Sequence, residues 1–230
     1  MNSESIDLRW KDLYRIAGIA AIISQAVIVL GIIAYVIWPY APGKESTESI
    51  LLFLQKDWLG GLISLDLFLF VGNLFSITLF LALYVSFREV NDSYALIALA
   101  LGLISVVLLI PSRPILELFI LSRSYAIAGS EAAKNQLLSA AGALLTLFDG
   151  TNWFMNTLLG AISLLISSLL MLKSKIYSRA TAWVGIVTNL IVCGFFIPVA
   201  GTLLLFLCLP GYLAWYFLLA RRFFQMSRGT

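Results

Sequence analysis

The sequence predicts an all-α fold: a polytopic membrane helix bundle with six transmembrane helices in one domain, residues 1–230, and short helices at the outer interface. Three observations support this prediction. The chain is 61% hydrophobic and 12% charged, with a mean hydropathy of +0.98, whereas a soluble domain is about half apolar and about a quarter charged. Long apolar runs recur along it, and its Lys and Arg residues gather between alternate runs. Such a chain has too little polar surface to cover a water-facing globule.

Apolar runs define the six spans, because a hydrocarbon core of about 30 Å needs about 20 helical residues for each crossing. The first run follows Arg9, Lys11 and Arg15 and ends before Pro39. It is too long for the apolar region of a signal peptide and lacks a small-x-small cleavage motif. The predicted spans are residues 13–38, 59–87, 94–121, 152–172, 180–197 and 202–220.

Two shorter helices are predicted between the spans, both on the outer side. Ser46 or Thr47 can cap a helix in "GKESTESILLFLQKDW", whose apolar residues would contact lipid or protein at the interface. A second short helix is predicted over residues 131–148. In the turn "REVNDS", Ser93 is the expected cap of the third span.

The distribution of Lys and Arg predicts the orientation. Six spans place ten of these residues on the side of both termini: Arg9, Lys11, Arg15, Arg88, Lys173, Lys175, Arg179, Arg221, Arg222 and Arg228. The other side holds Lys44, Lys56, Arg123 and Lys134, and Arg113 lies inside the third span. By the positive-inside rule, the N- and C-termini are therefore expected in the cytoplasm.

Several classes of chemistry have no support in this composition. The chain has no His, which excludes His-ligated haem, HExxH zinc sites, Ser-His-Asp triads and His proton relays. Cys193 and Cys208 lie inside apolar runs without a CxxC motif. No basic run with interleaved aromatics indicates nucleic acid, and the Gly-x-Gly-Asp pattern of intramembrane aspartyl proteases is absent. No cofactor is predicted.

Seven polar residues in or beside the spans form the candidate site. A charge at membrane depth costs about 2.5–3.5 kcal/mol on insertion scales and usually faces a bundle interior. Counting about 20 residues from Arg88, Ser93 and Lys173, at the predicted inner ends of the spans, brings Asp66, Arg113 and Asn152 to one level, the outer third of the membrane. The candidate pocket residues are Asp66, Asn73, Arg113, Glu117, Asp149, Asn152 and Asn156.

The stretch "IPSRPILE" predicts a break in the third span. Pro111 and Pro114 lack N–H donors, so the carbonyls of Val107 and Ile110 lose their helical partners. Arg113, between the two prolines, could serve these carbonyls. Broken helices beside buried charges form binding sites in many transporters, and they also occur as structural kinks.

The charge balance leaves two interpretations of this site open. If Asp66, Glu117 and Asp149 converge on Arg113, the excess negative charge needs a proton or a bound divalent cation. Glu117, one turn beyond Arg113, would lie on the same helical face. In the alternative, Arg113 pairs with Glu117 or Asp66 for structure, while Asp149 caps the fourth span in water. Thr151 and Asn152 are further candidates for that cap.

Three stretches carry a family resemblance. They are "LISLDLFLFVGNLFSITLFLALY" after the short helix "ESTESILLFLQ", then "ALIALALGLISVVLLIPSRPILEL", and finally "LLMLKSKIYSRATAWVGI". Over about residues 14–217 the chain resembles a family of small bacterial six-helix integral membrane proteins, catalogued as a domain of unknown function, number four-three-eight-six. The resemblance implies a six-helix fold in a bacterial cytoplasmic membrane. It implies no reaction.

Three functions are compatible with these patterns. The pocket could bind or transport a small polar ligand, a cation or a lipid headgroup, with Arg113 holding an anionic group. The protein could instead be a non-catalytic accessory or assembly subunit of a larger membrane complex. The third function is a membrane enzyme that uses its carboxylates as acid and base. The expected partners are the lipid bilayer and other membrane proteins, with no nucleic acid, and a bound lipid or divalent cation is the ligand that a pocket would hold.

Overall fold

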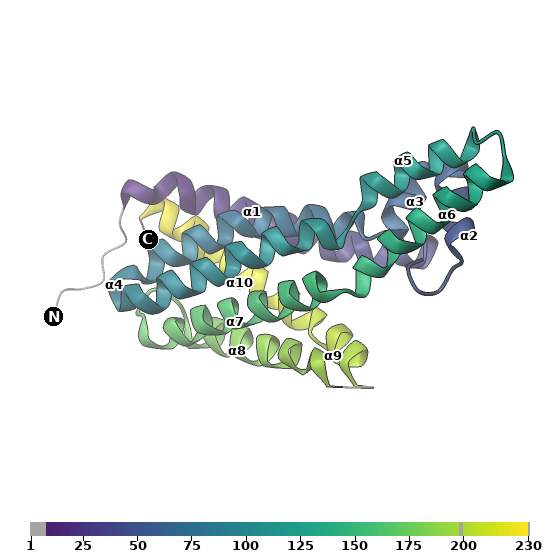
Figure 1. Ribbon diagram of the computed structural model, residues 1–230. Coiled ribbons are helices and arrows are strands. Elements are labelled where there is room, and N and C mark those ends of the chain that lie inside the picture. Colours follow the sequence, from purple (N-terminus) through teal and green to yellow (C-terminus); the bar gives the residue numbers. More distant parts are fainter. Residues whose placement is uncertain (1–7, 198–199, 230) are drawn as a thin grey trace.

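The computed structural model describes residues 8–197 and 200–229, and all regular elements among them are helical (Figure 1). A bundle and a cap lie at opposite ends of the molecule. The bundle contains η1 (Leu8–Trp10), α1 (Lys11–Ile37), α4 (Leu67–Ser112), α7 (Thr151–Lys173), α8 (Arg179–Cys193), η3 (Gly194–Phe196), α9 (Gly201–Leu207) and α10 (Leu209–Arg228). The cap contains α2 (Thr47–Lys56), α3 (Trp58–Ser64), α5 (Ile115–Ala126), α6 (Glu131–Leu145) and η2 (Thr146–Asp149).

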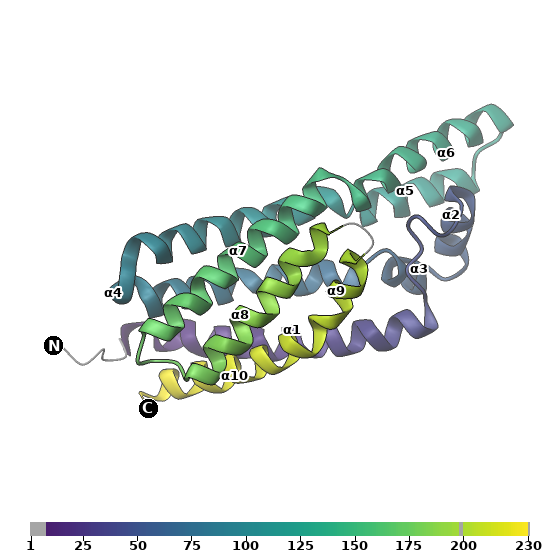
Figure 2. The ribbon, with the colours of Figure 1, turned by 90° about the horizontal axis from the view of Figure 1, so that it is seen from below.

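Helix α4 consists of two antiparallel segments that turn at Asn91 (Figure 2). The backbone of Asn91 leaves the helical region there, with φ −164° and ψ 99°. Its side-chain oxygen accepts a hydrogen bond from the N–H of Tyr94 at 3.0 Å, which caps the second segment. The cap is therefore Asn91 rather than Ser93, the residue that the sequence suggested.

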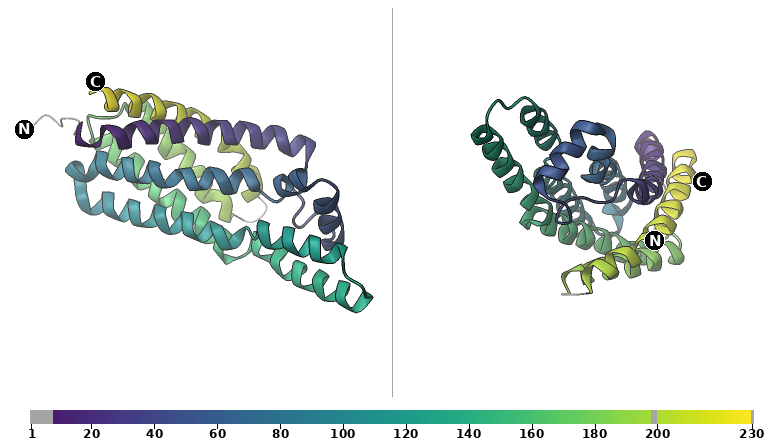
Figure 3. Two further views of the ribbon diagram at one scale, coloured as in Figure 1. Left: turned by 90° about the horizontal axis from the view of Figure 1, so that it is seen from above. Right: turned by 90° about the vertical axis from the view of Figure 1, so that its right-hand side faces the viewer.

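The bundle helices run along one long axis and pack side by side (Figures 2 and 3). Helix α1 packs against both α4 and α10, while α7 packs against α4 and α8, and α8 also contacts α10. Small residues allow close approach between helices. At Gly102, for example, an added Cβ would lie 2.5 Å from the ring of Phe80 on the antiparallel segment of α4.

The two largest hydrophobic cores lie in the bundle and in the cap, and a smaller third cluster of Ala161, Val192 and Cys208 also lies in the bundle. The bundle core includes the buried side chains of Leu83, Trp215 and Phe223 and lies in the half of the bundle away from the cap. The cap core includes Leu51 and Leu118. Helix α2, for which lipid or protein contact was expected, thus turns its apolar face toward protein, with Ser46 as its N-cap at 3.1 Å from the N–H of Ser49.

Between the bundle core and the cap core, two helical segments contain no buried residue. No residue of 67–78 in α4 or of 151–160 in α7 is buried. Most residues of 79–87, further along the same segment of α4, are buried. These two segments connect the bundle core to the cap.

Four helical segments are long and apolar enough to cross a membrane: Lys11–Ile37, Leu67–Ala126, Glu131–Lys173 and Arg179–Phe196. The second of them contains both antiparallel segments of α4. These segments fit an all-α bundle of the membrane class. Six spans and cytoplasmic termini stay predictions.

The helices differ from the predicted spans mainly at the ends that face the cap. The helix expected at 59–87 is interrupted at Asp66, which separates α3 from α4. The helix expected at 94–121 is interrupted at Arg113, and its last part is α5 of the cap. Residues 202–220 are divided between α9 and α10 around Cys208, and α10 continues to Arg228. Both interruptions near the cap coincide with candidate site residues.

Candidate functional site

Asp66 forms the break between α3 and α4. Its φ is 69° and its ψ is 27°, and it is the one non-glycine residue with positive φ in the described part of the chain. This left-handed conformation costs roughly 1–2 kcal/mol for a residue with a side chain, although Asp tolerates it better than most. The side chain is buried. With this backbone conformation, the carboxylate lies inside the protein.

Arg113 occupies the second break, between the end of α4 and the start of α5. Pro111 lies in the last turn of α4, and Pro114 is the N-cap residue of α5. The carbonyl of Ile110, which was expected to lose its partner, accepts the backbone N–H of Arg113 at 3.2 Å. The Arg113 side chain therefore does not serve that carbonyl and turns inward instead, with 4% of the residue exposed.

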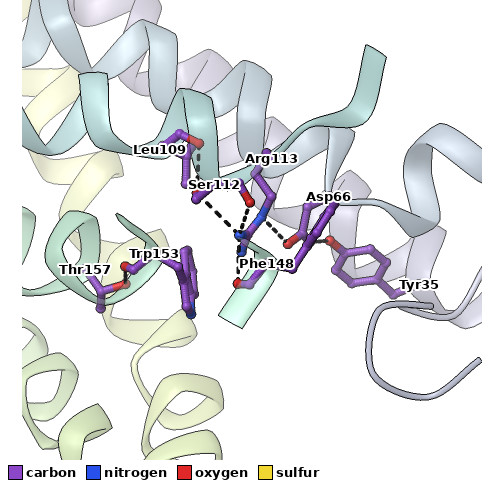
Figure 4. A network of polar contacts seen from close by, with 8 residues as sticks. All are labelled: Tyr35, Asp66, Leu109, Ser112, Arg113, Phe148, Trp153 and Thr157. Atoms are coloured by element: carbon purple, nitrogen blue, oxygen red, sulfur yellow. Dashed lines mark hydrogen bonds and ion pairs between the residues drawn. The ribbon is translucent and has the colours of Figure 1, made fainter. Parts of the chain in front are cut away.

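The Arg113 guanidinium joins the breaks at Asp66 and Arg113 and the short helix η2 in one hydrogen-bonded network (Figure 4). Its Nε donates to Oδ2 of Asp66 at 2.8 Å. Its Nη1 donates to the carbonyl of Ser112 and to the carbonyl of Phe148 in η2, both at 3.0 Å. The Tyr35 hydroxyl on α1 donates to the other oxygen, Oδ1, of Asp66. The pair thus links α1, α4 and η2.

Aromatic rings cover the faces of the ion pair. The guanidinium carbon of Arg113 lies 4.2 Å from the ring centroid of Trp153 on α7 and 5.0 Å from that of Phe148, within cation–π range. Tyr40 packs edge-on against Tyr35 at 6.4 Å. Burial raises the pKa of Tyr40, and the negative charge of Asp66 raises that pKa further, so this phenol stays protonated. The ion pair is enclosed on several sides.

Asp66 and Arg113 neutralise each other, which answers the question of charge balance. Glu117 and Asp149, which would have supplied excess negative charge, are both exposed and make no ion pair with Arg113. Among the described residues, no group of three or more His, Cys, Asp or Glu side chains could hold a metal ion. The geometry therefore matches the structural interpretation, with Asp66 rather than Glu117 as the partner of Arg113.

Glu117 lies away from the network because the chain breaks between it and Arg113. A spacing of four residues brings side chains to one face only within a continuous helix, and α5 begins after Pro114. The prediction that Asp149 caps the helix of the fourth span, α7, was also wrong. The N-cap residue of α7 is Gly150, with no side-chain cap hydrogen bond, so neither Asp149, Thr151 nor Asn152 caps this helix.

Asn73 and Asn156 make hydrogen bonds to α4 further from the cap than the ion pair. The Nδ2 group of Asn73 donates to the carbonyl of Val106 at 3.3 Å, and that of Asn156 donates to the carbonyl of Ser105 at 2.7 Å. These carbonyls belong to the second segment of α4, about 10 Å along the helix from Arg113. The two amides approach it from its first segment and from α7. They hold helices together rather than line the ion-pair site.

The structure thus places the seven candidates in three groups. Asp66 and Arg113 form the buried pair, Asn73 and Asn156 clamp α4, and Glu117, Asp149 and Asn152 belong to neither group. Sequence reasoning missed Tyr35 and Phe148. Tyr35 carries a hydroxyl group near the end of the first apolar run, and that position could have indicated a polar contact. Phe148 contributes a carbonyl, which any residue has, so no pattern in the sequence could single it out.

Comparisons of the chain with protein-family models, with curated proteins and with solved structures give no match.

Proposed function

We propose that this protein is a non-catalytic integral membrane protein that serves as an accessory or assembly subunit of a larger membrane complex. In this proposal the bundle crosses the membrane six times with both termini in the cytoplasm, and the cap stands on the outer side. The polar cluster holds the cap on the bundle. Of the three functions that the sequence allows, this one agrees best with the arrangement of the candidate residues.

The buried ion pair is the observation that carries the proposal. The charge of Arg113 is balanced by Asp66 at 2.8 Å, two carbonyls accept from its Nη1, and two rings lie over it. An anionic ligand would have to displace Asp66 from a buried site, and breaking such a pair leaves an uncompensated charge. The charge of Arg113 is thus balanced within the protein, which supports a role in packing better than a role in ligand exchange.

The positions of the charges support the membrane orientation. The second segment of α4, residues 92–112, rises about 31 Å, close to the thickness of a hydrocarbon core. The ten Lys and Arg residues of the predicted inner side belong to the segments at the bundle end opposite the cap (Figure 1). In this frame the Asp66–Arg113 pair lies at the outer boundary, and the cap lies beyond it.

The cap surface supports a partner role. Leu116 and Ile120 of α5 are 69% and 61% exposed, and Ile127, which directly follows α5, is 85% exposed. In the proposed orientation, the second segment of α4 already spans the hydrocarbon core. The three side chains therefore lie beyond the hydrocarbon, on the water side. Apolar side chains grouped on one helix outside the lipid indicate a protein contact. The binding and enzyme hypotheses have no comparable support, since only two of the seven candidates meet and they pair with each other.

The test compares two double variants of the full-length protein. We expect Leu116→Glu with Ile120→Glu to remove the protein from its native complex, measured by mass and subunit stoichiometry after mild-detergent extraction. Asn135→Glu with Gln136→Glu adds the same charge to exposed positions of α6 and should leave the complex intact. Wild-type protein that stays alone under these conditions, and that carries ions or lipid in a vesicle assay, would overturn the proposal in favour of transport.

A further inference from the structure

We propose that the exposed apolar face of α5 binds the same face of a second copy of this chain, in a parallel two-fold pair. Leu116, Ile120 and Ile127 form this face. The inference rests on the proposed function for the membrane orientation, and it names the partner that covers this part of the cap. It is carried by the charges beside the face and by the orientation that two copies share in one membrane.

The apolar face points away from the cap core. Leu116 lies four residues before Ile120 and Ile127 lies seven residues after it, a spacing that keeps helical side chains in one stripe. Leu118 and Ser122, each two residues from Ile120, point to the opposite side of the helix and are buried. The stripe therefore lies where another protein surface can reach it.

Opposite charges border the stripe on its two sides. Glu117 lies three residues before Ile120 and Arg123 three residues after it, which places them about 60° to either side of the stripe. Both side chains are exposed, and the ion pairs among the described residues include neither of them. Charged residues beside an apolar seam are the ones that form salt bridges between paired helices.

Arg123 keeps its N–H groups available in this position. Its guanidinium carbon lies 5.1 Å from the ring centroid of Phe119, and such a contact covers one face of the planar group. The N–H donors lie in the plane of the guanidinium and point outward from it. Arg113 shows the same combination, since it donates to Asp66 while two rings cover it.

The membrane selects the parallel arrangement. Two copies in one bilayer share one orientation, so a two-fold axis between them runs along the membrane normal. Helix α5 leads away from the bundle (Figure 1), so this axis makes the two α5 helices parallel. In a parallel pair, each side of one helix meets the opposite side of the other, and Glu117 faces the partner's Arg123. An antiparallel pair would bring like charges together instead.

The separation along the helices suits this ion pair. Glu117 and the partner's Arg123 differ by six residues, or about 9 Å of helical rise. Side chains in a helix lean toward its N-terminus, so the long Arg side chain reaches back toward Glu117. The two-fold axis forms this ion pair twice. The face of α5 is thus complementary to itself in both shape and charge.

The experiment measures association of the full-length protein in liposomes. Copies labelled at the N-terminus with a donor or an acceptor dye are mixed, and energy transfer is followed as the protein-to-lipid ratio falls. We expect wild type to associate saturably. Glu117→Arg or Arg123→Glu alone should weaken association about tenfold, because two symmetric ion pairs become repulsive. The two reversals together should restore it to within about twofold.

The double reversal also separates pairing from helix stability. Glu117 lies in the first turn of α5 and Arg123 in its last turn, where each charge favours the helix through its dipole. If the single variants lost association because α5 was weakened, the double variant would be worse than either. Glu131→Arg makes the same charge change in the first turn of α6 and should associate like wild type.

Cysteine substitutions test the register without changing a charge. Ile120→Cys and Ile127→Cys should each give a covalent dimer with copper phenanthroline, because seam residues of a parallel pair meet their own copies. An antiparallel pair centred on Ile120 would link only the first of these variants. Wild type, with Cys193 and Cys208 in the bundle, is the background control. These variants decide the question if a charge reversal fails to fold.

Wild type that stays monomeric at every protein-to-lipid ratio would overturn the inference, as would association that ignores both charge reversals. The accessory role is judged separately. If monomeric protein still leaves its native complex on Leu116→Glu with Ile120→Glu, the accessory role stands and a different protein covers α5. A parallel dimer that joins no larger complex would uphold the pairing and refute the accessory role.

Discussion

At the scale of single residues, Arg113 shows how a buried charge is accommodated inside the protein. It has a carboxylate, two carbonyls and two aromatic rings as partners. A buried pair of this kind contributes little net stability, because desolvation of both charges offsets their attraction. Removing one partner is different, since the other charge then stays buried alone. The pair therefore specifies where the cap sits more than it stabilises the protein.

This asymmetry gives a prediction for two variants. Arg113→Met should lower the free energy of unfolding by about 3 kcal/mol, because Asp66 is left buried without a partner. Asp66→Asn together with Arg113→Met removes both charges and should lose clearly less than Arg113→Met alone. Reversible unfolding in mixed detergent micelles measures both values. If Arg113→Met unfolds like wild type, the ion pair is not structural and a ligand role regains support.

At the scale of elements, the second segment of α4 is held from two sides by side-chain amides. Ser105 and Val106 are neighbours in sequence, yet Asn156 of α7 reaches one carbonyl and Asn73 of the first α4 segment reaches the other. Backbone carbonyls in an apolar setting accept such additional bonds readily, because water is not there to compete. The segment that carries Arg113 is thus fixed below its break.

We expect Asn156→Ala to lower the free energy of unfolding by about 0.6 kcal/mol, and at most about 1.7, the range for interhelical hydrogen bonds in membranes. Asn152→Ala is the matched control. Asn152 is half-exposed one turn earlier on the same helix, and its removal should change the value by less than about 0.5 kcal/mol. Equal effects of the two substitutions would show that the bond to Ser105 contributes nothing.

The helices themselves were largely predictable, whereas their breaks near the cap were only partly so. The two prolines around Arg113 signalled one interruption directly. The interruption at Asp66 had no signal of its own, because the partners of its side chain, Tyr35 and Arg113, come from distant parts of the chain. The choice of Asp66 over Glu117 depended on the break between α4 and α5, since an unbroken helix would have placed Glu117 beside Arg113.

At the scale of the whole molecule, the cap and the bundle are two packed units with separate cores. Lipid and protein both accept an apolar helix face, so the sequence of α2 could not show whether Ile50, Leu51 and Leu54 touch the membrane or other helices. They are buried in the cap core. The composition predicted the bundle, whereas the cap could be recognised only from the three-dimensional arrangement of its helices.

Separate cores predict separate stabilities. Leu118→Ala in the cap core should lower local stability by about 2–5 kcal/mol, seen as faster amide hydrogen exchange in α2 and α5 but not in the half of the bundle away from the cap. Leu83→Ala in the bundle core should instead accelerate amide hydrogen exchange in the bundle but not in α2 and α5. Both residues are fully buried. If either substitution accelerates exchange everywhere by the same factor, the cap and the bundle unfold as one unit.

The hairpin of α4 has a consequence for how the chain enters a bilayer. Asp66 directly precedes its first segment and Arg113 directly follows its second, so the ends of the hairpin carry opposite charges 2.8 Å apart. In the proposed orientation both charges must cross the hydrocarbon during biosynthesis. A hairpin inserted as one unit carries them across as a neutral pair, whereas helices inserted one after the other would expose each charge to lipid separately. The ion pair that fixes the finished cap thus also favours insertion of this helical hairpin in a single step.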